Sequence, residues 1–164
     1  RSAKTKVIMP EDHSEAAASW SMDSLEITDA FGRIVPISLR YNTGFMDAAV
    51  RASVRDRVTF FWRFDDDPLM GAGGPAPEME AGLAEMEAAI IAAIPGDGGS
   101  LVAVRLGNGM VEYAVAFFSD AAHESFAENF EPPKVFFNKF AAQQFEHGHD
   151  FWPEYLPTGF ETEG

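Results

Sequence analysis

Apolar and polar positions alternate clearly in the first ordered part of the chain. Residues 20–27 show a rough alternation and residues 33–42 a more regular one, with turn-forming residues at 28–32 between them. Side chains of a strand point to opposite faces in turn, so this pattern predicts a β-hairpin. Pro36 cannot donate a backbone hydrogen bond, which places one strand of this hairpin at the edge of a sheet.

The strongest strand and helix patterns follow. Residues 57–64 (RVTFFWRF) are β-branched and aromatic, which predicts a strand. In residues 78–94 the apolar positions recur at steps of four, three, four and four, which predicts one buried helical stripe. The stripe consists of Met79, Leu83, Met86, Ile90 and Ile94. Pro77 before it and Pro95-Gly96 after it mark the helix ends. A short Ala-rich helix is expected over residues 44–54.

The second half of the chain repeats the strand and helix signals. Residues 100–106 and 110–119 are apolar runs around an Asn-Gly turn, which predicts a hairpin. Asp120 is the expected N-cap of a helix that reaches Phe130, with His123 or Glu124 at the capping-box position. Pro132-Pro133 ends that helix, and residues 134–140 predict a last strand.

From residue 57 onwards, the order of elements is strand, helix, strand, strand, helix, strand. This order predicts an α+β fold of the ferredoxin-like, split βαβ kind, with the hairpin of residues 20–42 added in front. We expect a flexible N-terminal arm at 1–18, a single domain at 19–157 and a C-terminal tail at 158–164.

Composition and charge narrow the possible functions. The chain has 164 residues, 12 Lys and Arg against 26 Asp and Glu, a formal net charge of −14 and no Cys. Such a charge repels phosphate backbones and anionic lipid, so we expect the chain to bind neither nucleic acids nor membranes. We expect its partner to be a protein with a basic surface. The absence of Cys excludes disulfides, thiolate nucleophiles and iron–sulfur clusters.

One cluster has residue types that ligate metals. His147 and His149 lie two positions apart between Glu146 and Asp150, and on a strand they would point the same way toward a Zn²⁺ or Ni²⁺ ion. A third ligand, His123 or His13, would have to come from elsewhere. The alternative is a solvated acidic turn, so these two histidines are weak candidates and no cofactor is expected.

Other motifs are less specific. Asp65, Asp66 and Asp67 could bind Ca²⁺, but they lack the spacing of a calcium loop and suit a solvated loop. Residues 71–74 are Gly-rich and precede a helix, without the residues of a nucleotide-binding loop. No serine lies in a nucleophile elbow, so catalysis has little support.

The acidic residues suggest a docking surface instead. Glu78 and Glu80, with Glu85 and Glu87, lie off the apolar stripe of the predicted helix. Together with Asp65–Asp67 they could form an acidic face for a basic partner, because charge complementarity steers association. The alternative is an ordinary solvated helix face.

The order of motifs resembles a bacterial family known as domain of unknown function 695. The resemblance covers roughly residues 20–157. The matching segments are Gly74-Pro75-x-x-Glu78, Leu83-Ala84-Glu85-Met86-Glu87, the strand 111–118 with its final Phe117-Phe118 pair, and 150–157, where Pro153 follows Trp152 instead of preceding it. The resemblance implies an intracellular α+β domain without established catalytic residues. The helix and strand plan of this family is also distantly similar to that of the ribonuclease E inhibitor B family, whose members bind that enzyme directly.

The sequence therefore predicts a soluble, cytoplasmic, non-catalytic regulator or inhibitor that binds a protein through an acidic face. Two alternatives remain open. One is a metal-binding domain or metal-dependent hydrolase that uses residues 146–150, and the other is a small-ligand binder that uses the aromatic sheet.

Overall fold

The computed structural model describes residues 19–64, 70–71, 74–75, 77–136, 139–145 and 151–157. In these residues the chain has an α+β fold with a six-stranded antiparallel sheet in the order β1-β2-β6-β7-β3-β8. The sheet strands are β1 (Trp20–Thr28), β2 (Ile34–Asn42), β3 (Asp56–Arg63), β6 (Gly99–Gly107), β7 (Met110–Phe117) and β8 (Ala141–Phe145). Two short strands, β4 (Met70–Gly71) and β5 (Gly74–Pro75), pair separately.

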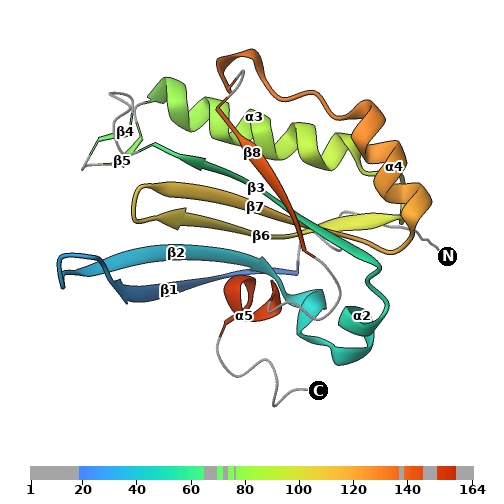
Figure 1. The fold of residues 1–164 in the computed structure, drawn as a ribbon, viewed down its shortest axis with the longest axis horizontal. Helices are drawn as coiled ribbons and strands as arrows, with labels where there is room; N and C mark the ends of the chain where they lie inside the picture. The colour runs from blue at the N-terminus through green and yellow to red at the C-terminus, as the bar shows by residue number, and fades with distance from the viewer. Residues whose placement is uncertain are drawn as a thin grey trace, which may run out of the picture.

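Four helices and two 3₁₀ turns accompany the sheet in the described ranges. They are α2 (Ala48–Ala52), α3 (Pro77–Ala93), α4 (Asp120–Asn129), α5 (Phe151–Tyr155), η1 (Thr43–Met46) and η2 (Lys134–Phe136). In Figure 1, α3 and α4 lie at the top of the view and α2 and α5 at the bottom, with the strands between them. The sheet therefore separates two helical layers and carries a core on each face.

The core beneath α3 and α4 is built from large side chains. Met79, Met86 and Ile90 of α3 are fully buried against the sheet, as the predicted stripe required. Gly82 lies on the same stripe, and a Cβ there would come within 3.1 Å of the ring of Phe136 in η2. The absent side chain of this glycine thus allows η2 to pack directly on α3.

The core on the opposite face has a different composition. There β6 and β7 present small residues, including Ala103, Ala114 and Ala116, each completely buried. The bulk comes from the covering segments, chiefly Phe45 of η1 and Phe151 of α5. Because neighbouring strand residues face opposite ways, the same strands serve both cores with different side chains.

Most of the elements predicted from the sequence are confirmed. The two hairpins, the strand near residue 57 and the long helix lie where the patterns placed them, and β1 is the edge strand next to the Pro36-containing β2. The turn between β6 and β7 has positive φ at Asn108 and Gly109, which is the geometry that favours Asn-Gly in a two-residue hairpin loop.

Three expectations need correction. The predicted strand at 134–140 is wrong: 134–136 form η2, 139 and 140 lie in no strand, and the strand at the sheet edge is β8. The N-cap of α4 is Ser119, whose side chain accepts a hydrogen bond from the amide of Ala122, and not Asp120. The expected helix at 44–54 is split into η1 and α2, because Asp47 caps a new helix through the amide of Ala49.

Aromatic packing explains why the predicted strand at 134–140 does not form. Residues 134–140 are apolar enough for a strand, but Phe136 and Phe140 turn toward Trp62, with ring centroids 5.5 and 5.9 Å away. Tertiary packing of these rings thus overrides the local strand propensity.

Candidate functional site

The solvent side of α3 and α4 forms the most uniformly charged surface among the described elements. These two helices contain four and three acidic residues respectively and no Lys or Arg. Six of the seven carboxylates are exposed, and we call them the acidic layer: Glu78, Glu80, Glu85, Asp120, Glu124 and Glu128. Both helices cover the same face of the sheet (Figure 1), so the acidic layer belongs to one helical layer of the molecule.

The structure places only part of the predicted docking face. Glu78 and Glu80 lie exposed in the first turn of α3, where the positive end of the helix dipole favours acidic side chains. Asp65, Asp66 and Asp67 lie outside the described residues. The acids of α4 were not part of the prediction, and they extend the surface across a second helix.

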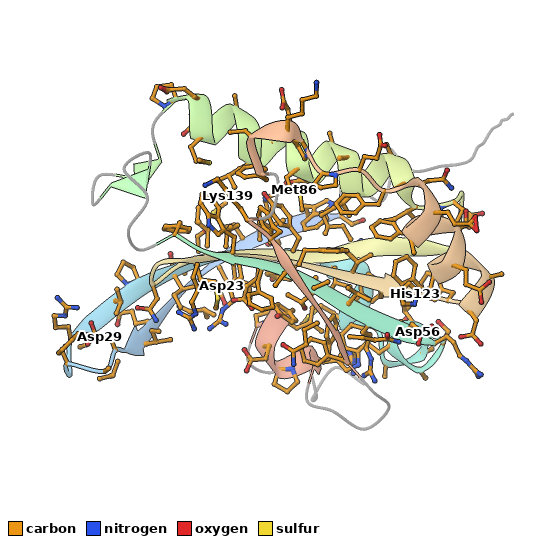
Figure 2. The ribbon with its side chains drawn as sticks, turned by 45° about the horizontal axis from the view of Figure 1, so that its top comes forward. Asp23, Asp29, Asp56, Met86, His123 and Lys139 are labelled. Atoms are coloured by element: carbon orange, nitrogen blue, oxygen red, sulfur yellow. The ribbon has the colours of Figure 1, made fainter. Side chains whose placement is uncertain are left out.

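The predicted metal cluster cannot be placed, since His147 and His149 also lie outside the described residues. The proposed third ligand, His123, is described, and its Nδ1 lies 3.4 Å from Oδ2 of Asp56 while its ring stacks on Phe117. Figure 2 shows His123 and Asp56 close together at one end of the sheet. In the described ranges, no three His, Asp or Glu side chains are grouped as a metal site.

A groove of about 300 Å³ lies between α3 and the β1–β2 hairpin. Apolar side chains make up most of its lining, with Ser38, Arg40, Glu87 and Tyr113 as the polar contributors. The lining apolar residues are Met22, Leu83, Ala84, Val104, Leu106 and Val111. This groove is a feature that the sequence did not predict, because its walls come from five elements, β1, β2, α3, β6 and β7.

An ion pair closes one part of this groove. Both terminal nitrogens of Arg40 contact the carboxylate of Glu87, one of them at 3.1 Å, and the guanidinium also lies 5.1 Å from the ring centre of Trp20. The two charges therefore neutralise each other, and the pair ties β2 to α3. A phenol completes the wall, since Tyr113 donates a hydrogen bond of 2.9 Å to the carbonyl oxygen of Leu83.

A polar network lies on the opposite face, beneath α5. The hydroxyl of Tyr155 donates to Oε1 of Glu112 at 2.7 Å and accepts from Thr59 at 3.0 Å. Arg105 reaches the other oxygen of Glu112 and a carboxylate oxygen of Glu154, both at 3.2 Å. The network holds α5 against the sheet through a carboxylate that is itself buried.

Burial affects the acid–base properties of two tyrosines. Burial raises the pKa of Tyr155 well above its ordinary value of 10.0, and the nearby Glu112 carboxylate raises it further. Burial likewise raises the pKa of Tyr113, with a second contribution from Glu87. Both phenols therefore stay protonated at neutral pH and act as hydrogen-bond donors and not as bases.

The sequence contained a signal for part of this network. Arg105 and Glu112 each interrupt an apolar run, and the Asn-Gly turn between their strands fixes their register so that they lie directly opposite. Their pairing could have been deduced from the turn. The contributions of Thr59 and Tyr155 could not, because 96 residues separate them.

Comparison with known proteins adds no assignment. The chain matches no family model, and no curated protein or solved structure shows significant similarity to it. Among the helices that the structure describes, none is both long enough and apolar enough to cross a membrane.

Proposed function

We propose that the chain is a non-catalytic protein-binding regulator or inhibitor that docks a basic partner through its acidic layer. The observation that carries this proposal is the complete absence of Lys and Arg from α3 and α4, whose six exposed acids all belong to the helical layer on one face of the sheet. A surface of one sign attracts an oppositely charged protein and orients it before contact.

Burial of the other candidate groups supports a binding role over a catalytic one. The Tyr155–Glu112–Arg105 network lies under α5, with Tyr155 2% and Glu112 8% exposed, so a substrate could not reach it without displacing that helix. The acids of the layer, by contrast, are exposed, and of the six only Asp120 contacts a described basic residue, Arg55 at 3.4 Å. The metal-binding alternative at residues 146–150 stays a prediction.

A finer description of the fold belongs to the same proposal. We assign β3, α3, β6, β7, α4 and β8 to a ferredoxin-like split βαβ core, with β1 and β2 added beside β6. Two observations support this: β7 lies between β3 and β6 and is antiparallel to both, and α3 and α4 pack on one face. The resemblance to domain of unknown function 695, and the bacterial cytoplasm as the compartment, remain predictions.

The test compares two variants with the same change in net charge. The first, Glu124→Gln with Glu128→Gln, neutralises exposed acids of the acidic layer. The matched control, Asp23→Asn with Glu154→Gln, removes two acids from the α5 side of the sheet. Proteins captured from native lysate at low and high salt are then identified by mass spectrometry.

The expected result is one basic protein that wild type and control retain, that high salt releases and that the α4 variant loses. Salt releases it because the Debye length falls from about 10 Å at 0.1 M to about 3 Å at 1 M. Equal loss with both variants would show that overall charge, and not this surface, causes capture. Retention unaffected by salt would remove the electrostatic basis of the proposal.

A further inference from the structure

The face of the β1–β2 hairpin beside α3 is uncovered, and it carries two exposed apolar side chains, Met22 and Ile34, among polar ones. On β1, Met22 shares this face with Ser24 and Glu26, and the neighbouring β2 adds Ile34. Met22 is 66% and Ile34 69% exposed, whereas the apolar residues that β2 presents to the opposite face, such as Leu39, are buried. The groove beside α3 continues this surface toward the centre of the sheet.

The position of this surface beside α3 would allow a second helix to pack on it. α3 covers the neighbouring strands, and packed helix axes lie about 8–10 Å apart, so a second helix beside α3 would lie directly over the hairpin. The small side chain of Ala84 in the groove wall allows a close approach on that side. Met22, Val104 and Leu106 would then contact its apolar side from below.

The charges in and around the groove indicate which charge the bound helix should carry. Inside it, Arg40 and Glu87 neutralise each other, so a small anion would find both terminal nitrogens of the guanidinium already engaged. Outside it, Glu26 is exposed on β1, and Glu80 is exposed on α3 one turn before Ala84. Neither carboxylate forms an ion pair with a described residue. The border of the groove therefore favours Lys or Arg on the partner.

A second copy of this chain does not meet these requirements. Two copies would each carry a net charge of −14, and neither long helix of the described structure contains Lys or Arg. The occupant must therefore be a different protein.

We propose that the groove between α3 and the hairpin docks a basic amphipathic helix of the partner. Apolar side chains of that helix enter between Met22 and Leu83, and flanking Lys or Arg side chains pair with Glu26 and Glu80. This mode, an amphipathic helix in an apolar groove, is common in peptide recognition. The inference rests on the proposed function, because it specifies the element of the basic partner that is bound.

The probe is a fluorescent 18-residue peptide of Leu and Lys with Leu at helical spacing. Its controls are the same composition in alternating order, and a Leu and Glu peptide with the helical pattern. Binding to the full chain is measured by fluorescence anisotropy at constant salt. We expect the first peptide to bind and both controls to bind at least about tenfold more weakly, a difference of about 1.4 kcal/mol.

A pair of variants on α3 localises the binding. Ala84→Arg fills and charges the groove wall, whereas Ala92→Arg makes the same change at an exposed position of the same helix outside the groove. Arg is a good helix former, so both variants should fold, which circular dichroism can verify. We expect Ala84→Arg to weaken binding at least tenfold and Ala92→Arg to have little effect.

The outcomes separate this inference from the proposed function. If both Arg variants weaken binding equally, or the alternating peptide binds as well as the helical one, general attraction explains binding and the groove proposal is wrong. If Glu124→Gln with Glu128→Gln changes nothing while Ala84→Arg abolishes binding, the groove stands and α4 has no part in docking. Concentration-dependent self-association lost in Ala84→Arg would assign the groove to a second copy and overturn the proposal.

Discussion

The two faces of the sheet are held by different physical means. Under α3 and α4 the strands themselves supply the bulk, with Tyr113, Val115 and Phe117 of β7 fully buried. On the other face, the intervening positions of the same strand are Ala114 and Ala116, and bulk arrives from η1 and α5. The first face therefore depends on apolar volume that the strands already carry, and the second on segments brought from elsewhere in the chain.

The second face also contains the buried polar network of Glu112, Tyr155, Thr59 and Arg105. Glu112 lies on β7 between Val111 and Tyr113, so it points away from the α3 core and meets Arg105 and Tyr155. The Nε of Arg105 is buried and has no hydrogen-bond partner in the described structure. A buried polar network is specific but sensitive to the loss of one member, whereas an apolar core loses stability in proportion to the volume removed.

The largest effect should come from the α3 core. Met86→Ala removes a fully buried side chain and leaves a cavity, which should lower the free energy of unfolding by about 2–5 kcal/mol. Ile91→Ala on the same helix is the control, because Ile91 is 51% exposed and should change the free energy by about 0.5 kcal/mol or less. Urea denaturation measures both. Similar losses from the two variants would contradict the burial described for this face.

The next effect tests the network on the other face. Arg105→Met leaves the buried Glu112 carboxylate without its charged partner, and we expect a loss of about 1–3 kcal/mol. Adding Glu112→Gln removes the stranded charge while keeping an acceptor for Tyr155. The double variant should therefore recover at least about 0.5 kcal/mol relative to Arg105→Met. Simple additivity of the two losses would show that the pair is not coupled.

The smallest effect is a loss of folding stability that appears only in alkaline solution. It allows the two faces to be compared directly, because each contains one buried tyrosine, Tyr113 or Tyr155. Above pH 10.0 the unfolded chain ionises its tyrosines while Tyr113 and Tyr155 stay protonated in the folded state. The unfolded state then binds fewer protons, so stability should fall as the pH rises, by up to about 1.4 kcal/mol per pH unit for each tyrosine.

Tyr113→Phe and Tyr155→Phe should each reduce that slope, as measured by denaturation between pH 9 and about pH 11. An unchanged slope in either Phe variant would show that the corresponding phenol ionises freely in the folded state.

Local patterns predicted the regular elements well because their causes are local. The stripe of α3 and the Asn108-Gly109 turn depend on neighbouring residues, and both are confirmed. The stripe nevertheless missed Gly82, whose burial depends on contact with η2. The candidate site was predicted only in part: Glu78 and Glu80 are exposed as expected, but the acids of α4 join them only because α4 packs beside α3 on the same face.

The sequence alone therefore determined the two hairpins, the strand near residue 57, the long helix with its apolar stripe and the acidic character, because periodicity and composition express short-range preferences. Tertiary structure alone decided where Phe136 and Phe140 turn, how Arg40 meets Glu87, and how Thr59 reaches Tyr155. These contacts join residues far apart in the chain. Their geometry depends on the simultaneous packing of several elements, which no local window of sequence contains.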